Sequence, residues 1–220
     1  MNNNSIYFLS CSLLMLVLAV FGFGGNALFY DSLSHVSNWV LAHGLIMFSW
    51  LIWISIQSFL VRNRKGRLPK TWVSWNVLLA PLVLISLVLV TIFAFQSGKK
   101  TLEDLTFNLF VCLNFVILFL ATIKNDSLGG EYERYMVMTN LAIIFPALKR
   151  ISGFMNQGAE LALVFLACLL MGVFVYELRV LNRITKASWL GLVLIVFGVI
   201  CTAVLPGLQF WEALIHQLLL

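Results

Sequence analysis

The chain alternates between long apolar blocks and short polar connections, and the spacing of the blocks predicts its architecture. Seven blocks can be marked, and the long ones match the roughly 20 apolar residues that an α-helix needs to cross a bilayer. The pattern therefore predicts an all-α polytopic membrane helix bundle that forms a single domain over residues 1–220. The expected transmembrane spans are about 6–23, 38–61, 72–95, 105–123, 135–148, 159–178 and 189–205.

The fifth block is the weakest of these spans. It is short, it contains Pro146, and Lys149 and Arg150 follow it directly. A proline inside a helix removes a backbone hydrogen bond and clashes with the preceding turn, so a break is expected there. We still interpret 135–148 as a span, because the distribution of basic residues requires it.

The basic residues concentrate in alternate connections between the blocks, and this sets the orientation. Ten lysines and arginines fall on one side of the seven expected spans and four on the other. Because short loops rich in Lys and Arg stay in the cytoplasm, the N-terminus is expected inside and the C-terminus outside. Without the fifth span, the basic residues of 179–186 would lie on the opposite side from those of 62–70.

The composition agrees with a membrane protein. Hydrophobic residues make up 61% of the chain and charged residues 10%, whereas a soluble domain carries about 25% charged residues. The net charge of +5 comes from the short connections, so it indicates topology and not nucleic acid binding. We expect a multi-pass protein of the bacterial inner membrane, in contact with the lipid bilayer and with other membrane subunits.

Two further sequence signals bear on processing and redox chemistry. Residues 1–5 lack the basic region that begins a secretory signal, so the first block is expected to be a retained span. The cysteines form no CxxC pair, which predicts buried free thiols and argues against a disulfide framework or a structural zinc site. They are Cys11, Cys112, Cys168 and Cys201, each inside an apolar block.

The second span carries a polar stripe. His43, Trp50 and Gln57 are spaced seven residues apart, and heptad steps on an α-helix drift by only about 20°. Polar groups at this depth need hydrogen-bond partners, so the stripe is expected to face other helices. Two interpretations stay open: a packing stripe satisfied by neighbouring helices, or a face that binds a ligand or handles protons.

The predicted topology places further polar residues at the outer side. Arg150 follows the proline-broken fifth span, where its guanidinium could reach lipid headgroups or pair with Glu160. Together with the stripe, this gives a candidate ligand pocket. Its members are His43, Trp50, Gln57, Arg150 and Glu160.

The C-terminal segment 208–219 offers a second candidate site. Glu212 and His216 are four residues apart and share a helix face. Together with His43 or His35 they could bind a divalent metal. The alternative is an interfacial amphipathic helix on the outer leaflet, with its polar stripe opposite an apolar face.

Three short motifs resemble those of a group of uncharacterised seven-span bacterial membrane proteins. The second span has the pattern H-x6-W-x6-Q and precedes a basic loop, and two later motifs follow the same group. The matching segments are His43–Gln57, Arg134–Met136 with Phe145–Arg150, and Tyr176–Arg179. The resemblance implies a seven-span fold and supplies no activity.

The chain also departs from this group. Members carry further histidines after the basic loop, before the second motif and before the last span. Here the corresponding positions hold Pro69 or Lys70, Tyr132 and Lys186. His43 alone of that set remains, which weakens any haem or metal site that the resemblance implies.

Three classes of function fit these features. The first is a non-enzymatic binding module or a subunit of a membrane complex, and it is favoured because paired aspartates, HExxH and GxSxG motifs are absent. The second is a redox protein that holds haem or a divalent metal around His43 at the outer side. The third is a small-solute transporter, although the cytoplasmic halves of the spans look too apolar for a polar path. No catalytic residue is proposed.

Overall fold

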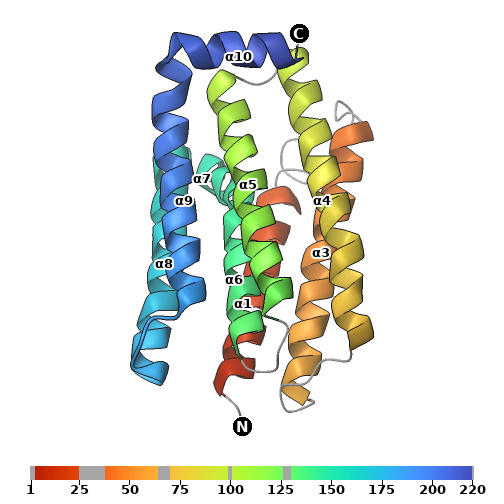
Figure 1. Cartoon of the computed structure of the whole chain (residues 1–220), viewed down its shortest axis with the longest axis vertical. Helices are drawn as coiled ribbons and strands as arrows, with labels where there is room; N and C mark the ends of the chain where they lie inside the picture. Colours follow the sequence, from red (N-terminus) through yellow and green to blue (C-terminus); the bar gives the residue numbers. More distant parts are fainter. Residues whose placement is uncertain (1–2, 25–37, 64–69, 99–100, 126–129, 220) are drawn as a thin grey trace.

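The structure is a computed structural model that describes residues 3–24, 38–63, 70–98, 101–125 and 130–219 (Figure 1). Within these ranges every regular element is a helix. The elements are α1 Asn3–Ala19, η1 Val20–Gly24 (a π-helical turn that extends α1), α3 Asn38–Asn63, α4 Lys70–Gln96, α5 Leu102–Lys124, α6 Glu131–Ile143, α7 Phe145–Phe154, α8 Ala159–Leu181, α9 Lys186–Val204, η3 Leu205–Gly207 and α10 Gln209–Leu219.

Six segments of the described chain are long and apolar enough to cross a membrane. Only 22–39% of the most apolar window in each is buried inside the bundle, so much of their surface is left to face lipid. They coincide with six of the seven expected blocks, and the chain is a multi-pass α-helical membrane protein. The segments are Ser5–Gly24, Asn38–Asn63, Ser74–Gln96, Leu102–Lys124, Ala159–Leu181 and Lys186–Gly207.

The fifth expected block does not form one helix. Its sequence is divided between α6, which ends at Ile143, and α7, which begins at Phe145. Pro146 lies in the first turn of α7, where its missing N–H costs no helical hydrogen bond, and its ring prevents α6 from continuing. The chain therefore breaks near Pro146, as expected. Neither helix is among the candidate spans, so a membrane crossing at 135–148 stays a prediction.

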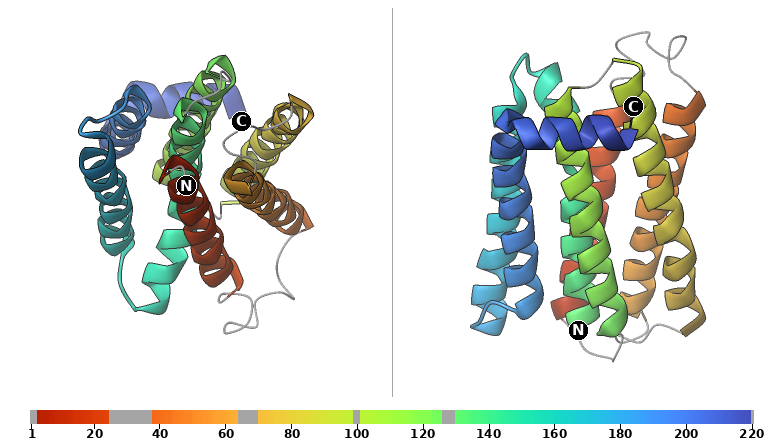
Figure 2. Two further views of the ribbon diagram at one scale, coloured as in Figure 1. Left: turned by 90° about the horizontal axis from the view of Figure 1, so that it is seen from below. Right: turned by 45° about the horizontal axis from the view of Figure 1, so that its top comes forward.

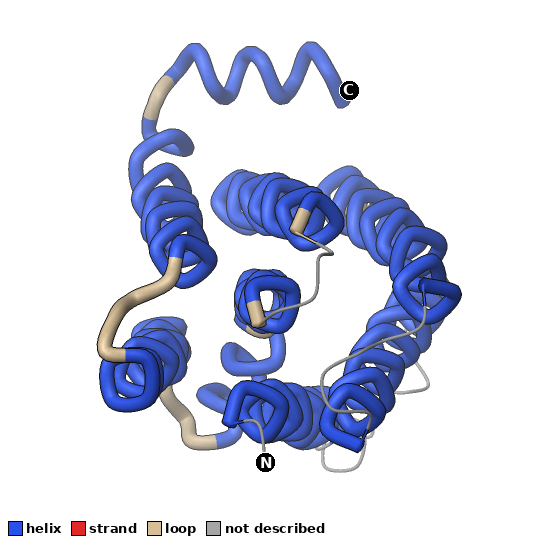
Figure 3. The backbone as a smooth tube through the Cα atoms, turned by 60° about the horizontal axis from the view of Figure 1, so that its bottom comes forward, coloured by secondary structure: helices blue, strands red, loops and turns tan. Residues whose placement is uncertain are grey.

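Helix α6 forms the centre of the bundle. Every residue from Tyr132 to Ile143 is buried, and Figure 3 shows one helix enclosed by a ring of others. Its main neighbours are α5, α9 and α1. Because protein and not lipid surrounds α6, this helix can carry polar side chains that are satisfied by neighbouring helices. Hydropathy alone therefore does not identify α6 as a helix of the bundle.

The two chain termini lie at opposite ends of the bundle (Figure 1). We call the end where α3, α5 and α8 finish the N-terminal end, and the other the C-terminal end. Helix α10 lies across the C-terminal end (Figure 2). Trp211 Nε1 donates to Thr106 Oγ1 of α5 at 2.9 Å, and Ile215 is buried while Phe210 is exposed, so one face of α10 packs on the bundle.

Short polar motifs fix where several helices begin and end. Thr101 and Asp104 form a reciprocal capping box at the start of α5, which satisfies backbone N–H groups that have no helical partner. Asn182 adopts a left-handed conformation with φ of 54° and ends α8. Three residues later, the Thr185 side chain accepts from the backbone N–H of Ser188 and begins α9.

Small residues let α9 approach α5 and α6 closely. A Cβ added at Gly191 would lie 2.5 Å from Met138 Sδ of α6, and one at Gly198 would lie 3.1 Å from Asn114 Nδ2 of α5. Asn114 Nδ2 also donates to Leu194 O across this contact at 3.1 Å. Small residues with interhelical amide hydrogen bonds are the usual packing solution inside a membrane.

The four cysteines are free thiols. Cys168 is exposed on α8, and the other three are half-buried. The expectation that all four are buried is therefore wrong for Cys168. This residue is exposed on a helix that is long and apolar enough to cross a membrane.

Candidate functional site

The polar stripe of the second span lies on α3, and each of its members contacts a different neighbour. His43 Nδ1 lies 3.0 Å from Ser86 Oγ of α4, and Trp50 Nε1 donates to Asn140 Oδ1 of α6 at 2.8 Å. Gln57 bonds to residues of α4 and α6, as described next. Seven residues of α-helix rise by about 10 Å, so the three side chains lie at three depths and do not form one site.

Gln57 belongs to a hydrogen-bonded cluster centred on Asn76 of α4, toward the N-terminal end. The two amides bond reciprocally, with Gln57 Nε2 to Asn76 Oδ1 at 2.9 Å and Asn76 Nδ2 to Gln57 Oε1 at 3.1 Å. Trp53 Nε1 donates to Asn76 Oδ1 at 2.9 Å, and Asn76 Nδ2 donates to the Tyr132 hydroxyl at 2.6 Å. The cluster therefore joins α3, α4 and α6.

A buried ion pair lies at the same end of α6. Arg134 Nε is 3.4 Å from Glu177 Oε1 of α8, and the two side chains are 8% and 0% exposed. Glu177 also accepts hydrogen bonds from Thr185 N, Thr185 Oγ1 and Ser188 Oγ, each at 2.8 Å. A carboxylate is stabilised at the N-terminus of a helix, so Glu177 connects α6, α8 and the start of α9.

Other buried polar side chains lie near this ion pair. The rings of Tyr7 and Tyr176 stack at 4.2 Å, and Tyr7 is close enough to Arg134 and Glu177 to interact electrostatically. The Tyr7 hydroxyl and Glu133 Oε2 are buried without a hydrogen-bond partner of normal geometry in the described part of the chain. Such groups are uncommon in folded proteins, and neither cavity described below is lined by them.

The sequence analysis did not single out this buried cluster. In the sequence, Arg134 stands out as a basic residue of a short connection and as the start of a motif, and neither feature indicates a buried ion pair. A usable signal existed at Glu177, which lies inside the expected span 159–178, because a carboxylate within a span needs a partner. The cluster places buried polar groups at the N-terminal end of the bundle, and the absence of a continuous polar path stays a prediction.

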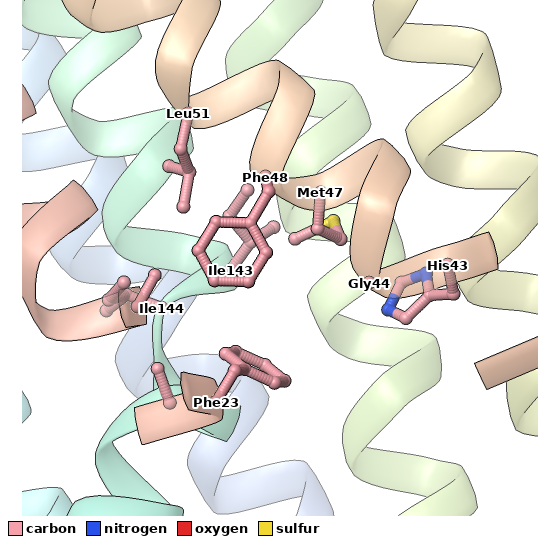
Figure 4. A pocket seen from close by; sticks show the side chains of 10 residues that line it. Phe23, His43, Gly44, Met47, Phe48, Leu51, Ile143 and Ile144 are labelled. Atoms are coloured by element: carbon pink, nitrogen blue, oxygen red, sulfur yellow. The ribbon is translucent and has the colours of Figure 1, made fainter. Parts of the chain in front are cut away.

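A narrow pocket lies near the C-terminal end, where α6 gives way to α7 (Figure 4). Its free volume is about 20 Å³, roughly the room that one water molecule needs. Apart from His43 the walls are apolar. They are formed by Ala19, Phe23, His43, Gly44, Met47, Phe48, Leu51, Ile143, Ile144 and Ala147.

His43 presents its imidazole at this pocket. Its Nδ1 lies 3.0 Å from Ser86 Oγ, which also lies 2.9 Å from Val83 O. The Ser86 hydroxyl can donate to either atom, so which imidazole nitrogen carries the proton depends on the tautomer. No described residue is hydrogen-bonded to Nε2.

Arg150 of α7 lies beside the same pocket. Its guanidinium sits over the Phe23 ring at 4.1 Å, and it is close enough to His43 to interact electrostatically. Arg150 Nη1 donates to Pro146 O at 3.3 Å, and no carboxylate of the described chain pairs with it.

The remaining candidate residues lie apart from this pocket. Glu160 is exposed at the start of α8, and it forms no ion pair with Arg150. Among the described side chains, no three of His, Cys, Asp and Glu are grouped closely enough to hold a metal. Glu212 is exposed on α10, and the side chain of His216 is outside the described part, so their metal site stays a prediction. His35 also lies outside the described residues.

A second cavity of about 110 Å³ lies between α4 and α5 beneath α10. Ile215 of α10 closes one side of it, and Thr91 and Asn108 form part of its wall. The Thr91 hydroxyl is buried without a hydrogen-bond partner in the described chain. The cavity carries no charged group, so it offers less chemistry than the pocket beside His43.

Comparison with known proteins adds no functional assignment. Neither a scan of protein-family models nor searches of curated proteins and of solved structures found a significant match for this chain.

Proposed function

We propose that the chain is a seven-pass membrane protein that binds a small membrane-soluble molecule in the pocket beside His43 and does not itself catalyse a reaction. The carrying observation is a narrow apolar pocket with a free imidazole nitrogen and a cation at its edge. Ligand pockets are typically apolar with a few polar groups that orient the ligand. Lipid-facing helices on all sides of the bundle give such a ligand access from the bilayer.

A binding module fits the geometry better than the two alternatives. Large side chains that are 0% exposed, including Trp50, Phe115 and Met136, fill the middle of the bundle, so a transport path would require them to move. A haem would not fit a pocket in which a water-sized sphere has about 20 Å³ of freedom.

The proposed orientation places the N-terminus in the cytoplasm and makes α6–α7 a seventh, protein-enclosed pass. It is supported by the opposite positions of the termini (Figure 1) and by the ten basic residues against four. We expect green fluorescent protein to fluoresce when fused before Met1, and alkaline phosphatase to be active when fused after Leu220. Fluorescence from fusions at both termini would instead place both in the cytoplasm and remove the seventh pass.

Filling the pocket is expected to abolish ligand binding. A tritiated short-chain alcohol that carries a photoreactive diazirine should label the segment of α3 that lines the pocket. Met47 lies in its wall, so Met47→Trp should reduce this labelling by about tenfold or more. Peptide mass spectrometry after irradiation locates the label.

The matched control is Met171→Trp on α8, where the native side chain is 65% exposed. This substitution adds the same volume on a lipid-facing surface and should leave labelling of α3 unchanged. Labelling spread evenly over exposed helices, and equal in both variants, would contradict the proposed binding site.

A further inference from the structure

The second cavity, beneath α10, has room that the pocket beside His43 lacks. Its free volume is about 110 Å³, against about 20 Å³ beside His43. Protein interiors are close-packed, and a domain holds few spaces larger than a water molecule. Atoms that line an empty space lose packing contacts, so a cavity of this size destabilises the fold unless a molecule fills it.

The surface that faces this cavity is apolar. Thr91 of α4 and Asn108 of α5 belong to its wall, but their oxygen and nitrogen atoms add no accessible surface to it. A buried water molecule needs several polar partners, and cavities without them stay dry. The chemistry of the wall therefore favours an apolar molecule over water.

The volume of the cavity limits the size of that molecule. An apolar cavity of about 150 Å³ binds benzene or xenon. The space beneath α10 is somewhat smaller, so it suits a compact molecule of about four or five carbon atoms. A long alkyl chain or a fused ring system is too large for it.

The position of the cavity indicates where the molecule comes from. Val88 of α4 and Leu109 of α5 line it and are 36% and 37% exposed, so a molecule dissolved in the bilayer can enter between these helices. Leu105 lies in the first turn of α5, which places the cavity within about 10 Å of the helix ends. Lipid chains end at the centre of the bilayer, so a free small molecule is a better occupant than the end of a lipid chain.

We infer that this cavity is a second binding site, which takes a free, compact hydrocarbon of about four or five carbon atoms from the bilayer. Helix α10 is its cover, because Ile215 closes one side of the cavity and is 3% exposed. The bond from Trp211 Nε1 to Thr106 Oγ1 at 2.9 Å holds this cover on α5. The described walls of the two sites have no residue in common, so the inference goes beyond the proposed function and does not depend on it.

The test is photolabelling of the purified protein in phosphatidylcholine nanodiscs with a tritiated dialkyl diazirine of about five carbon atoms. Peptide mass spectrometry should find the label on residues 88–92 of α4 and 105–112 of α5, which line the cavity. Xenon binds in apolar cavities and should reduce this label by about fivefold or more. It should leave unchanged the label on Met171 of α8, which is 65% exposed.

Two substitutions in the wall separate filling of the cavity from a change in its polarity. Cys112 is half-buried and lines the cavity, so Cys112→Phe should reduce the label on α4 and α5 by about tenfold as the ring occupies the space. The matched control is Cys168→Phe, which adds the same ring at an exposed position on α8 and should leave that label unchanged. Thr91→Val removes a hydroxyl at nearly constant shape and should also leave it unchanged.

Each contrary outcome has a distinct meaning. Label on α4 and α5 that rises in proportion to the probe and resists xenon would reflect ordinary contact with the lipid phase, and would overturn the inference even if Cys112→Phe failed to fold. Loss of label in Thr91→Val would overturn the assignment to a hydrocarbon, since the occupant would then need a hydrogen bond. Met47→Trp should leave the label on α4 and α5 intact, so failure of the pocket beside His43 and failure of this site are observed separately.

Discussion

Replacing Glu177 with glutamine is expected to lower the free energy of unfolding by about 3–5 kcal/mol, the cost of breaking a buried ion pair by removing one partner. The carboxylate is fully buried, faces Arg134 at 3.4 Å and accepts three hydrogen bonds from the start of α9. A glutamine has a similar shape, but it offers one acceptor oxygen and no charge. The substitution therefore weakens both the ion pair with Arg134 of α6 and the hydrogen bonds that Glu177 accepts at the start of α9.

The measurement is unfolding by sodium dodecyl sulfate in mixed micelles, followed by tryptophan fluorescence. Glu160→Gln is the control, since Glu160 is exposed on the same helix and surface substitutions usually change stability by less than about 0.5 kcal/mol. Arg134→Met combined with Glu177→Gln should cost less than the sum of the two single changes, because neighbouring sites are not additive. Equal effects of the substitutions at 160 and 177 would contradict the buried ion pair.

The helices that face lipid could be predicted from the sequence, and the helix that does not face lipid could not. Hydropathy measures transfer from water to lipid, so it locates α3, α4, α5, α8 and α9 closely. It fails for α6, whose Tyr132–Arg134 turn is polar and yet buried against other helices. Which helices surround α6 depends on tertiary packing, and no periodic pattern in the sequence indicates it.

The same limit applies to the candidate site. A heptad spacing fixed the angular position of His43, Trp50 and Gln57 on α3, and the structure keeps all three on a common face. Their partners depend on which helices pack against that face, and these are α4 and α6 at different depths. The charge count put His43 and Arg150 on the same predicted side of the membrane, and in the structure Arg150 lies over the ring of Phe23, which lines the same pocket as His43.

The proline in the fifth block connects the weak point of the sequence pattern with the pocket. Because α6 cannot continue through Pro146, the chain turns at Ile144 and begins α7. Ile143, Ile144 and Ala147, which flank this break, form one wall of the pocket. An unbroken helix would keep α6 straight beside α3, so the feature that made the span doubtful also shapes the proposed site.

The opposite wall depends on Gly22, and Gly22→Ala is expected to lower the free energy of unfolding by about 1–3 kcal/mol, the usual cost of overpacking. A Cβ at this position would lie 2.5 Å from Ala147 O and 2.9 Å from Ala147 Cα. Backbone atoms cannot move aside as a side chain can, so η1 would be pushed away from α7.

Two measurements separate this close contact from a general effect of helix propensity. At Gly172 of α8 an added Cβ meets nothing within 4 Å, so Gly172→Ala should leave stability unchanged or raise it by up to about 1 kcal/mol, because alanine favours helix over glycine. Gly22→Ala should also weaken probe labelling of α3, since Phe23 and Ala147, which lie on the two sides of this close contact, both line the pocket. Unchanged stability and labelling in Gly22→Ala would show that η1 does not rest on α7, and the pocket would then lack the wall that brings Arg150 onto Phe23.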